Sequence, residues 1–394
     1  MKKKFAVYTS TRAEYGLLYP LIKRLKQKDS FEVDIIVSGT HLLDKYGYTI
    51  KYIEADGIDI KYKVPILEEG FSSSEEEVTR AISEGLRQCG DILARENYCG
   101  VIVLGDRYEL LCICIAAMVC RIPIIHIHGG ELTEGAIDDK IRHAITKMAS
   151  IHFPSIEEYA NRIIQMGENP NWVYPVGALG IENIKSMELI KKQDLCKELN
   201  LPVNKKIAAV TFHPETGETS RDKNKEVEEL LKALLEMDLF SVITMPNSDV
   251  GGDEIYKTLC DYVEKYSDKM VLRKSLGQLR YLSLLSIADI MVGNSSSGII
   301  ESASFRLPTI NIGERQKGRL APENVIHCDC RQKEIEEAIR IALSESFRIS
   351  LKSYVNPYGD GDTSVKIVDV LDKIDFCDKN LIKKEFYDIN WVQK

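Results

Sequence analysis

Three carboxylates, Asp106, Glu131 and Asp138, stand where they could transfer protons. Asp106 and Glu131 each come shortly after an apolar run rich in Val and Ile, and Asp138 follows Glu131 closely. Carboxylates that share a pocket have their pKa values pushed apart by burial and like charge, which separates an acid from a base. The pattern therefore predicts acid–base chemistry. The structural alternative is that Asp106 and Asp138 cap helices, and for the neighbouring Asp139 we prefer that role.

Two histidines precede Glu131 and Asp138 in the chain. His126 and His128 occupy alternate positions of an expected strand and would share one face. Such a pair suggests a metal site, but no third metal-ligating residue lies at a standard spacing. Gly129-Gly130 instead suits the close approach of a bound molecule to the backbone. We therefore expect no metal and predict that His126 is packed in the core.

A serine-rich turn suits an anion. Gly293-Asn294-Ser295-Ser296-Ser297-Gly298 follows an apolar run at residues 287–292 and precedes a segment, residues 299–305, that can begin a helix. Free backbone N–H groups, serine hydroxyls and the positive end of a helix bind phosphate at such turns. The sequence therefore predicts a phosphorylated ligand, and the alternative is an ordinary turn capped by serine.

Further groups suited to anions follow other apolar runs. They are His213, Lys274, Ser275 and Arg315 in the second half of the chain, and Arg12 in the first. His213 can donate to a phosphate or act as a general acid. Arg12 can form a bidentate pair with a phosphate or carboxylate; the structural alternatives are a salt bridge with Glu14 and a solvated side chain. The anion-binding groups gather in the second half and the carboxylates in the first, which suggests a diphosphate held mainly by a second domain and a reacting centre facing the first.

The elements that must position these groups are parallel βαβ units, because short apolar runs alternate with longer helical patterns. Strands are expected at residues 5–8, 32–37, 100–104, 122–127, 151–153, 206–211, 240–244, 270–272, 290–292 and 309–312. The pattern restarts after Gly177, and the charged stretch 185–204 is expected to be one surface helix that leads into a second domain. We predict an α/β fold with two doubly wound Rossmann-type domains facing a central cleft, where ligands bind at the carboxyl ends of the strands.

Composition excludes several classes of protein. The 394 residues fit two domains, and the net charge of −8 argues against broad nucleic-acid binding. The apolar run at the N-terminus is broken by Thr9-Ser10-Thr11-Arg12, so it is neither a signal peptide nor a membrane span, and we expect a cytoplasmic protein without membrane partners. Of the ten cysteines, Cys112, Cys114 and Cys120 lie in an apolar helical stretch, so we expect free thiols.

Taken together and in order, several motifs resemble the hydrolysing UDP-N-acetylglucosamine 2-epimerases of sialic acid biosynthesis. The resemblance covers nearly the whole chain, from Lys4 to about Val370. The motifs are Thr11-Arg12-Ala13-Glu14-Tyr15-Gly16, Gly105-Asp106-Arg107, His126-Ile127-His128-Gly129-Gly130-Glu131, Asp138-Asp139-Lys140-Ile141-Arg142-His143-Ala144-Ile145-Thr146-Lys147, His213-Pro214 and Gly293-Asn294-Ser295-Ser296-Ser297-Gly298.

This resemblance implies the two-domain fold of GT-B glycosyltransferases. Residues 1–180 would form an N-terminal Rossmann-like domain with the catalytic carboxylates, residues 181–365 a nucleotide-binding domain, and residues 366–394 a C-terminal helix that crosses back. The resemblance also implies conversion of UDP-N-acetylglucosamine to UDP and N-acetylmannosamine through a 2-acetamidoglucal. No metal or redox cofactor takes part, and the enzyme would be a homodimer or homotetramer.

Site residues are carried over by matching position. The nucleotide-contacting set is Arg12, Ala13, Asn247, Lys274, Ser275, Ser295, Ser296, Glu301 and Arg315, with Glu301 suited to the ribose hydroxyls. Arg107 and His213 match positions near the diphosphate and the reacting sugar, and Asp106 and Asp138 match catalytic carboxylates. The animal enzyme has a catalytic glutamate where this chain has His128. That departure leaves Glu131 or His128 itself for one proton-transfer role.

Four other functions compete with this one. A sister enzyme acts on a 2,4-diacetamido-2,4,6-trideoxyhexose linked to UDP or GDP, as in legionaminic acid synthesis. The non-hydrolysing epimerase returns UDP-N-acetylmannosamine, and its motifs resemble these less closely around His128 and His213. A GT-B glycosyltransferase would need an acceptor. A catalytically silent nucleotide-sugar sensor would not need the carboxylates of the first domain.

Overall fold

The chain folds into two compact units. The computed structural model describes residues 2–71, 74–133, 137–213, 223–245, 252–274 and 276–389. Unit 1 consists of Met1–Glu131, Ile137–Asn183 and Tyr358–Lys394, and unit 2 consists of Leu132–Ala136 and Ile184–Pro357. Apart from residues 132–136, the chain therefore passes from unit 1 to unit 2 within the helix Leu179–Ser186 and returns between Pro357 and Tyr358.

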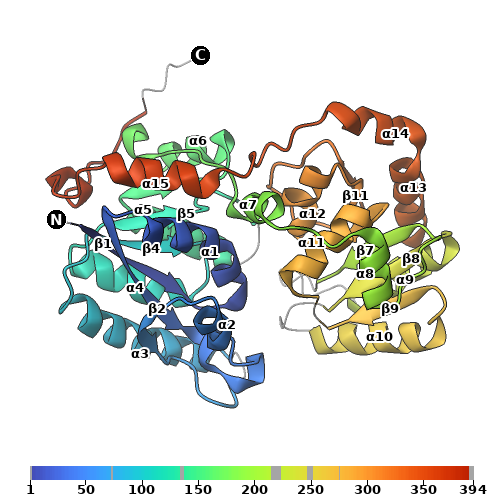
Figure 1. Ribbon diagram of the computed structural model, residues 1–394, viewed down its shortest axis with the longest axis horizontal. Helices are drawn as coiled ribbons and strands as arrows, with labels where there is room; N and C mark the ends of the chain where they lie inside the picture. The colour runs from blue at the N-terminus through green and yellow to red at the C-terminus, as the bar shows by residue number, and fades with distance from the viewer. Residues whose placement is uncertain are drawn as a thin grey trace. The chain divides into compact units, whose positions relative to one another are not determined.

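Unit 1 is built on a parallel sheet of six strands in the order β3-β2-β1-β4-β5-β6 (Figure 1). The strands are β1 Lys3–Thr9, β2 Phe31–Ser38, β3 Ile60–Val64, β4 Gly100–Leu104, β5 Ile124–Ile127 and β6 Ile151–Phe153. The helices are α1 Arg12–Gln27, α2 Ile50–Ala55, α3 Glu75–Leu93, α4 Glu109–Val119, α5 Ile137–Met148, α6 Glu157–Gln165, α7 Leu179–Ser186 and α15 Thr363–Lys373. Apolar side chains of α1 and α15 pack on one face of the sheet, and those of α3, α4 and α5 pack on the other.

Unit 2 repeats this plan with the strand order β12-β11-β10-β7-β8-β9. The strands are β7 Ile207–Thr211, β8 Phe240–Thr244, β9 Met270–Arg273, β10 Ile290–Gly293, β11 Thr309–Ile312 and β12 Val325–Cys328. The helices are α8 Lys192–Leu199, α9 Lys223–Glu236, α10 Gly252–Lys265, α11 Gly277–Ile287, α12 Ser297–Ile300, α13 Gln332–Leu343 and α14 Glu345–Ser350. Helices α9, α10 and α13 pack on one face of the sheet, and α8 and α11 pack on the other. The predicted pair of doubly wound α/β domains is confirmed.

Ten of the strands were predicted, and two edge strands, β3 and β12, were not. Two details of the helices also differ from the predictions. The stretch 185–204 holds the end of α7 and a separate helix, α8, which is closed by Asn200 in the left-handed conformation. The segment after the serine-rich turn forms a single α-helical turn, α12, followed by a 3-10 turn at Ser302–Phe305. The helix dipole available at that turn is therefore that of a very short helix.

A buried carboxylate holds the C-terminal segment onto unit 1. Glu168 is almost fully buried, and its two oxygens lie 2.5 Å from Lys147 Nζ, 2.5 Å from Lys384 Nζ and 3.0 Å from His152 Nε2. Lys384 also donates to the backbone carbonyls of Lys147 and Ala149, 2.7 Å away, at the end of α5. Burial alone would raise the pKa of Glu168, but the hydrogen bonds from His152, Lys147 and Lys384 outweigh it and lower the pKa from 4.5 to about 2.

Because the pKa of Glu168 is lowered by folding, its contribution to stability is present above pH 4.5 and is lost as the pH falls toward 2. Replacing Glu168 with glutamine should therefore lower the free energy of unfolding by roughly 2–3 kcal/mol at pH 7, and the difference from wild type should shrink below pH 4.5. Urea unfolding at several pH values measures this difference. The control is Glu158→Gln, whose carboxylate pairs with Arg162 at the surface and should change stability little. A difference for Glu168→Gln that is the same at every pH would contradict the assignment.

Candidate active site

Arg142 contacts three acidic residues of unit 1. Its guanidinium group, carried by α5, is buried and forms an ion pair with Asp106, which follows the end of β4. The same group lies 3.2 Å from the carboxylate of Asp139 and donates to the carbonyl oxygen of Glu131 over 2.8 Å. Asp138 lies in the first turn of α5. The structure therefore brings Asp106, the backbone of Glu131 and the helix of Asp138 together around one cation.

The two histidines after the apolar run do not share a face. His126 is the third residue of β5 and is fully buried; its Nε2 lies 2.8 Å from the carbonyl oxygen of Gly105, just before Asp106, and its Nδ1 lies 3.3 Å from Thr146 Oγ1. Burial lowers the pKa of His126 to about 3, so it is neutral at physiological pH. The prediction of a packed, hydrogen-bonded His126 is confirmed. His128 lies beyond the end of β5 with a φ of +63°, so the strand alternation assumed in the sequence does not reach it.

The first turn of unit 1 excludes one of the alternatives for Arg12, the salt bridge with Glu14. Glu14 forms a capping box with Thr11, and its Oε2 accepts hydrogen bonds from Ser10 N and Ser10 Oγ over 2.7 and 2.8 Å. Arg12 is exposed and lies over the ring of Tyr52, 4.4 Å from its centroid. Since the carboxylate of Glu14 is used by the cap, the alternative of an Arg12–Glu14 salt bridge is wrong. Ala13 is exposed beside Arg12.

Arg107 is held by a carboxylate of its own unit. Its guanidinium Nε lies 3.2 and 3.1 Å from the two oxygens of Glu109, and its NH2 lies 3.0 Å from Oε1. Glu109 is fully buried, whereas the Arg107 side chain is 43% exposed and remains accessible. Burial, together with the negative charge of Glu109, raises the pKa of Glu14 to about 7. Glu109 therefore acts on two neighbouring groups of unit 1: it pairs with Arg107, and its charge raises the pKa of Glu14.

In unit 2, Asn294 organises the serine-rich turn. It is fully buried; its Oδ1 accepts from His213 N over 2.7 Å, and its Nδ2 donates to His213 O over 2.8 Å. Its own carbonyl oxygen accepts from Arg315 NH1 over 3.1 Å and from Gln316 Nε2 over 2.8 Å. One asparagine therefore positions two predicted site residues, His213 and Arg315, that are far apart in sequence.

His213 is neutral in this arrangement. The residue is buried just after the end of β7, and burial followed by the charge of Arg315 lowers its pKa to about 3. A neutral imidazole has one N–H and can donate it to a phosphate oxygen. Because burial lowers its pKa, it is a poor source of a proton at neutral pH, whereas its N–H remains able to donate a hydrogen bond.

Glu301 is oriented by two hydroxyl groups. Its Oε2 accepts from Ser297 Oγ, which in turn accepts from Tyr281 OH over 2.8 Å. Burial raises the pKa of Glu301, and the hydrogen bond from Ser297 opposes that rise. The relay from Tyr281 on α11 therefore fixes the face that the Glu301 carboxylate presents to a ligand.

The remaining predicted nucleotide residues are distributed along the same unit. Ser295 and Ser296 are half-buried before α12, and Lys274 is exposed directly after β9. Asn247 and Ser275 lie outside the described residues. Sequence reasoning did not assign Arg142 or Asn294 to the site, although both stand in the quoted motifs. Each of the two is a polar residue that is buried, which distinguishes it from the residues beside it in its motif.

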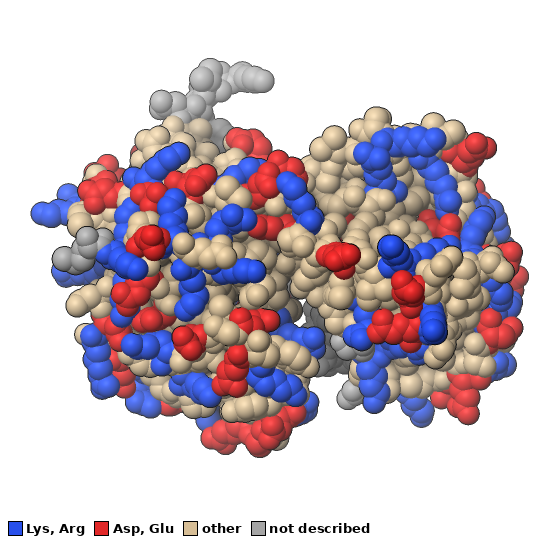
Figure 2. Space-filling view, in the orientation of Figure 1, with Lys and Arg blue, Asp and Glu red and all other residues tan. Residues whose placement is uncertain are grey.

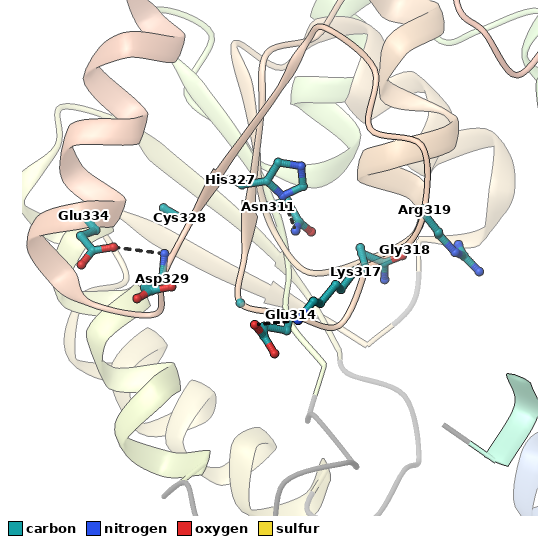
Figure 3. A pocket seen from close by; sticks show the side chains of 11 residues that line it. Asn311, Glu314, Lys317, Gly318, Arg319, His327, Cys328, Asp329 and Glu334 are labelled. Atoms are coloured by element: carbon teal, nitrogen blue, oxygen red, sulfur yellow. Dashed lines mark hydrogen bonds and ion pairs between the residues drawn. The ribbon is translucent and has the colours of Figure 1, made fainter. Parts of the chain in front are cut away.

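A pocket of about 560 Å³ opens next to this site in unit 2 (Figure 3). It lies at the ends of β11 and β12 and includes Asn311, His327 and Glu314 among its lining residues. In Figure 3 the side chains of Asn311 and His327 meet, with Asn311 Nδ2 3.1 Å from His327 Nδ1. None of the predicted nucleotide residues that the structure describes lines it, and Gln316, which does, donates to the carbonyl oxygen of Asn294.

Among the described residues, no three His, Cys, Asp or Glu side chains gather as metal ligands. None of the described helices has the length and apolar character of a membrane span. On the face of the molecule drawn in Figure 2, the described Lys and Arg side chains are interspersed with Asp and Glu. That face therefore does not present the continuous basic surface that binds nucleic acid.

Two doubly wound parallel units, one with clustered carboxylates and one with a serine-rich strand-end turn, define an α/β protein of the GT-B-like class. Residues 23–372 match the family described as UDP-N-acetylglucosamine 2-epimerase. The chain belongs to this family, among its hydrolysing 2-epimerases.

Relatives and solved structures agree with this membership. The chain is 37% identical over 394 residues to the polysialic acid biosynthesis protein P7 of Escherichia coli, with 98% of each chain covered. It is 38% identical over 350 residues to the hydrolysing GDP/UDP-N,N'-diacetylbacillosamine 2-epimerase of Campylobacter jejuni, covering 88% of this chain and 89% of that protein. The crystal structure of the Neisseria meningitidis UDP-GlcNAc 2-epimerase bound to UDP-GlcNAc has a TM-score of 0.79 at 18% identity, covering 94% of this chain and 100% of that chain, which shows the same fold.

Proposed function

We propose that this protein is a hydrolysing 2-epimerase that converts UDP-N-acetylglucosamine to UDP and N-acetylmannosamine. The observation that carries the proposal is the arrangement around Arg142, which gathers Asp106, the Glu131 backbone and the helix of Asp138 in one unit. A nucleotide-binding protein without chemistry would have no need of ionisable groups gathered in this way. The relative from Escherichia coli, named for polysialic acid biosynthesis and matched along almost its whole length, supports this choice of sugar.

The proposed reaction begins with departure of the diphosphate. The C2–H of the sugar is not acidic, but loss of UDP gives an oxocarbenium-like centre at C1 that makes the C2 proton labile. A carboxylate then removes this proton to give a 2-acetamidoglucal. Water adds at C1, and a proton returns to C2 from the opposite face. Each such proton-transfer group typically contributes about 100- to 10,000-fold to the rate.

The residues divide between these steps by their chemistry. Asp106, Glu131 and Asp138 are the candidates for the two proton transfers at C2. The N–H of His213 and the cations of Arg12 and Arg315 suit the developing negative charge of the leaving diphosphate, which preorganised donors stabilise. Glu301, aimed by Ser297, suits the ribose hydroxyls. The reaction needs no metal or redox cofactor. A homodimeric or homotetrameric state and a cytoplasmic location remain predictions.

A time course of proton NMR spectra in deuterated water tests the proposal. The purified protein is incubated with UDP-N-acetylglucosamine without added metal. Free UDP should appear together with N-acetylmannosamine that carries deuterium at C2, because the C2 proton is exchanged through the glycal. Accumulation of UDP-N-acetylmannosamine would instead identify a non-hydrolysing epimerase, and an intact substrate would exclude this sugar.

A second candidate substrate is a UDP- or GDP-linked 2,4-diacetamido-2,4,6-trideoxyhexose. Two relatives favour it: the Campylobacter jejuni enzyme and the UDP-N,N'-diacetylbacillosamine 2-epimerase of Legionella pneumophila, which is 34% identical over 387 residues. The same time course with UDP- and GDP-N,N'-diacetylbacillosamine separates the two proposals. Release of the nucleoside diphosphate from these sugars but not from UDP-N-acetylglucosamine would establish the second candidate.

Replacing Asn294 with alanine should weaken UDP binding by at least tenfold. The change removes both side-chain hydrogen bonds to the His213 backbone and leaves a buried N–H and C=O without those partners, which costs about 1–3 kcal/mol for each group. Calorimetric titration with UDP measures the affinity. The control is Ser283→Ala, because Ser283 is also buried in unit 2 and also bonds a backbone N–H and a backbone C=O. Both variants should melt at lower temperature, and equal UDP affinities would refute the role of Asn294.

A further inference from the structure

His128 has a backbone conformation that needs an explanation. Its φ of +63° lies in the left-handed region, which a side chain with a Cβ adopts rarely. The residue directly precedes Gly129-Gly130 and Glu131. Strained backbone of this kind persists when surrounding contacts hold it in place. The contacts of the imidazole ring are therefore informative.

The two ring nitrogens of His128 have different neighbours. Nε2 accepts a hydrogen bond from Leu179 N over 3.3 Å, so Nε2 carries no hydrogen. A neutral imidazole has one N–H, which must then be on Nδ1. Nδ1 lies 3.7 Å from Oε1 of Glu131, and a small shift of either side chain would bring the two atoms within hydrogen-bond distance. The Leu179 contact thus selects the tautomer whose N–H is on the side of Glu131.

Leu179 is the first residue of α7, the helix within which the chain leaves unit 1. The returning chain is bonded to the same segment. Ala178 N donates to Tyr358 O over 2.7 Å, and Glu182 accepts from Ser364 N and Ser364 Oγ over 2.7 and 2.5 Å. These bonds all lie within unit 1 and join the stretch where the chain leaves unit 1 through α7 to the stretch that begins with its return at Tyr358. We call these two stretches, residues 177–183 and residues 358–364, taken together the crossing segment.

We propose that His128 is a positioning residue that links Glu131 to the crossing segment. Its Nδ1–H orients the Glu131 carboxylate, and its Nε2 anchors the ring to the first N–H of α7. The proposal rests on the proposed function in one respect, because Glu131 is a proton-transfer candidate there. It also gives the histidine at this position a task other than replacing a glutamate as catalytic base, since Nε2 is occupied by a backbone donor.

Two substitutions separate the two contacts. His128→Asn keeps a donor near the position of Nδ1 and tolerates the left-handed backbone, but it is too short to reach Leu179. His128→Gln reaches the position of Nε2 with an acceptor oxygen and lacks a donor at the position of Nδ1. Arg121→Asn is the matched control, because Arg121 is an exposed residue of unit 1 that also has a positive φ, +57°.

The expected result is that both His128 variants lose at least tenfold in kcat while their Kd for UDP stays within twofold of wild type. His128→Gln should also shift the pH profile of kcat upward, because the ionised form of Glu131 loses its donor. Hydrogen exchange of the Leu179 amide should be faster in His128→Asn and unchanged in His128→Gln. Arg121→Asn should match wild type in all three measurements.

The outcomes distinguish this proposal from the proposed function. A wild-type protein that turns over none of the nucleotide sugars tested would reject the function, and the exchange of Leu179 would still report on the anchor. If wild type is active, a kcat within twofold of wild type in either His128 variant would overturn the positioning role. A parallel loss of kcat and UDP affinity in both variants would overturn it as well, because it would indicate a general structural role.

Discussion

Replacing Asp106 with asparagine is expected to lower kcat by about 100- to 10,000-fold, the contribution typical of a proton-transfer group. The amide cannot accept a proton from C2 or return one to it. The variant should still bind UDP with nearly wild-type affinity, because the residues assigned to the nucleotide lie in unit 2, apart from Arg12 and Ala13. Steady-state assays at saturating substrate, followed by NMR, measure kcat, and calorimetric titration measures the affinity.

The structure offers a matched control for this experiment. Asp139 lies on α5 and is also within ion-pair distance of Arg142, 3.2 Å away, but we assign it no part in the reaction. Asp139→Asn removes a negative charge from the same buried guanidinium group and should keep kcat within a few-fold of wild type. Equal losses in the two variants would mean that the charge balance around Arg142 is what matters. Retained turnover in Asp106→Asn would remove Asp106 from the mechanism.

Most of the strands that sequence reasoning found are buried on both faces. In β4 and β7 every residue is buried, so each reads as a continuous apolar run. The missed strands, β3 and β12, are at the edges of their sheets. β3 alternates exposed lysines with partly buried residues, and β12 has a single strand neighbour and no fully buried residue. Such segments lack the apolar run on which the prediction depended.

Only part of the site could likewise be predicted from the sequence. Titratable residues at strand ends, such as Asp106 and His213, could be identified because parallel strands bring their carboxyl ends to one edge. Arg142 and Asn294 could not, because their roles come from contacts with residues distant in sequence, such as Asp106 and His213. The left-handed backbone of His128 could not be predicted either, because strand periodicity does not indicate where a strand ends.

The turn that follows β10 depends on the absence of a side chain at Gly293. Its φ is +142°, and a Cβ added there would lie 1.9 Å from the carbonyl oxygen of Thr211. Gly293 and Thr211 are register partners on neighbouring strands near the middle of the sheet. Since the clash is with backbone, a rotamer change cannot relieve it. Strands β10 and β7 would have to separate.

Gly293→Ala should therefore lower the free energy of unfolding by about 3 kcal/mol, near the upper end for overpacking a core. It should also weaken UDP binding by at least 100-fold, because the displaced residues include Asn294, which holds His213 and Arg315. Urea unfolding gives the stability, and titration with UDP well below the melting temperature gives the affinity of the folded fraction.

The control for this change is Gly90→Ala in the last turn of α3. A Cβ at Gly90 meets no heavy atom within 4 Å, and alanine is favoured over glycine inside a helix, so this variant should gain roughly 0.5–1 kcal/mol. The same chemical change thus has opposite expected signs at the two positions. If Gly293→Ala were as stable as wild type and bound UDP equally well, the β10 turn would be able to move without loss. The nucleotide would then have to be held by groups other than those that Asn294 positions.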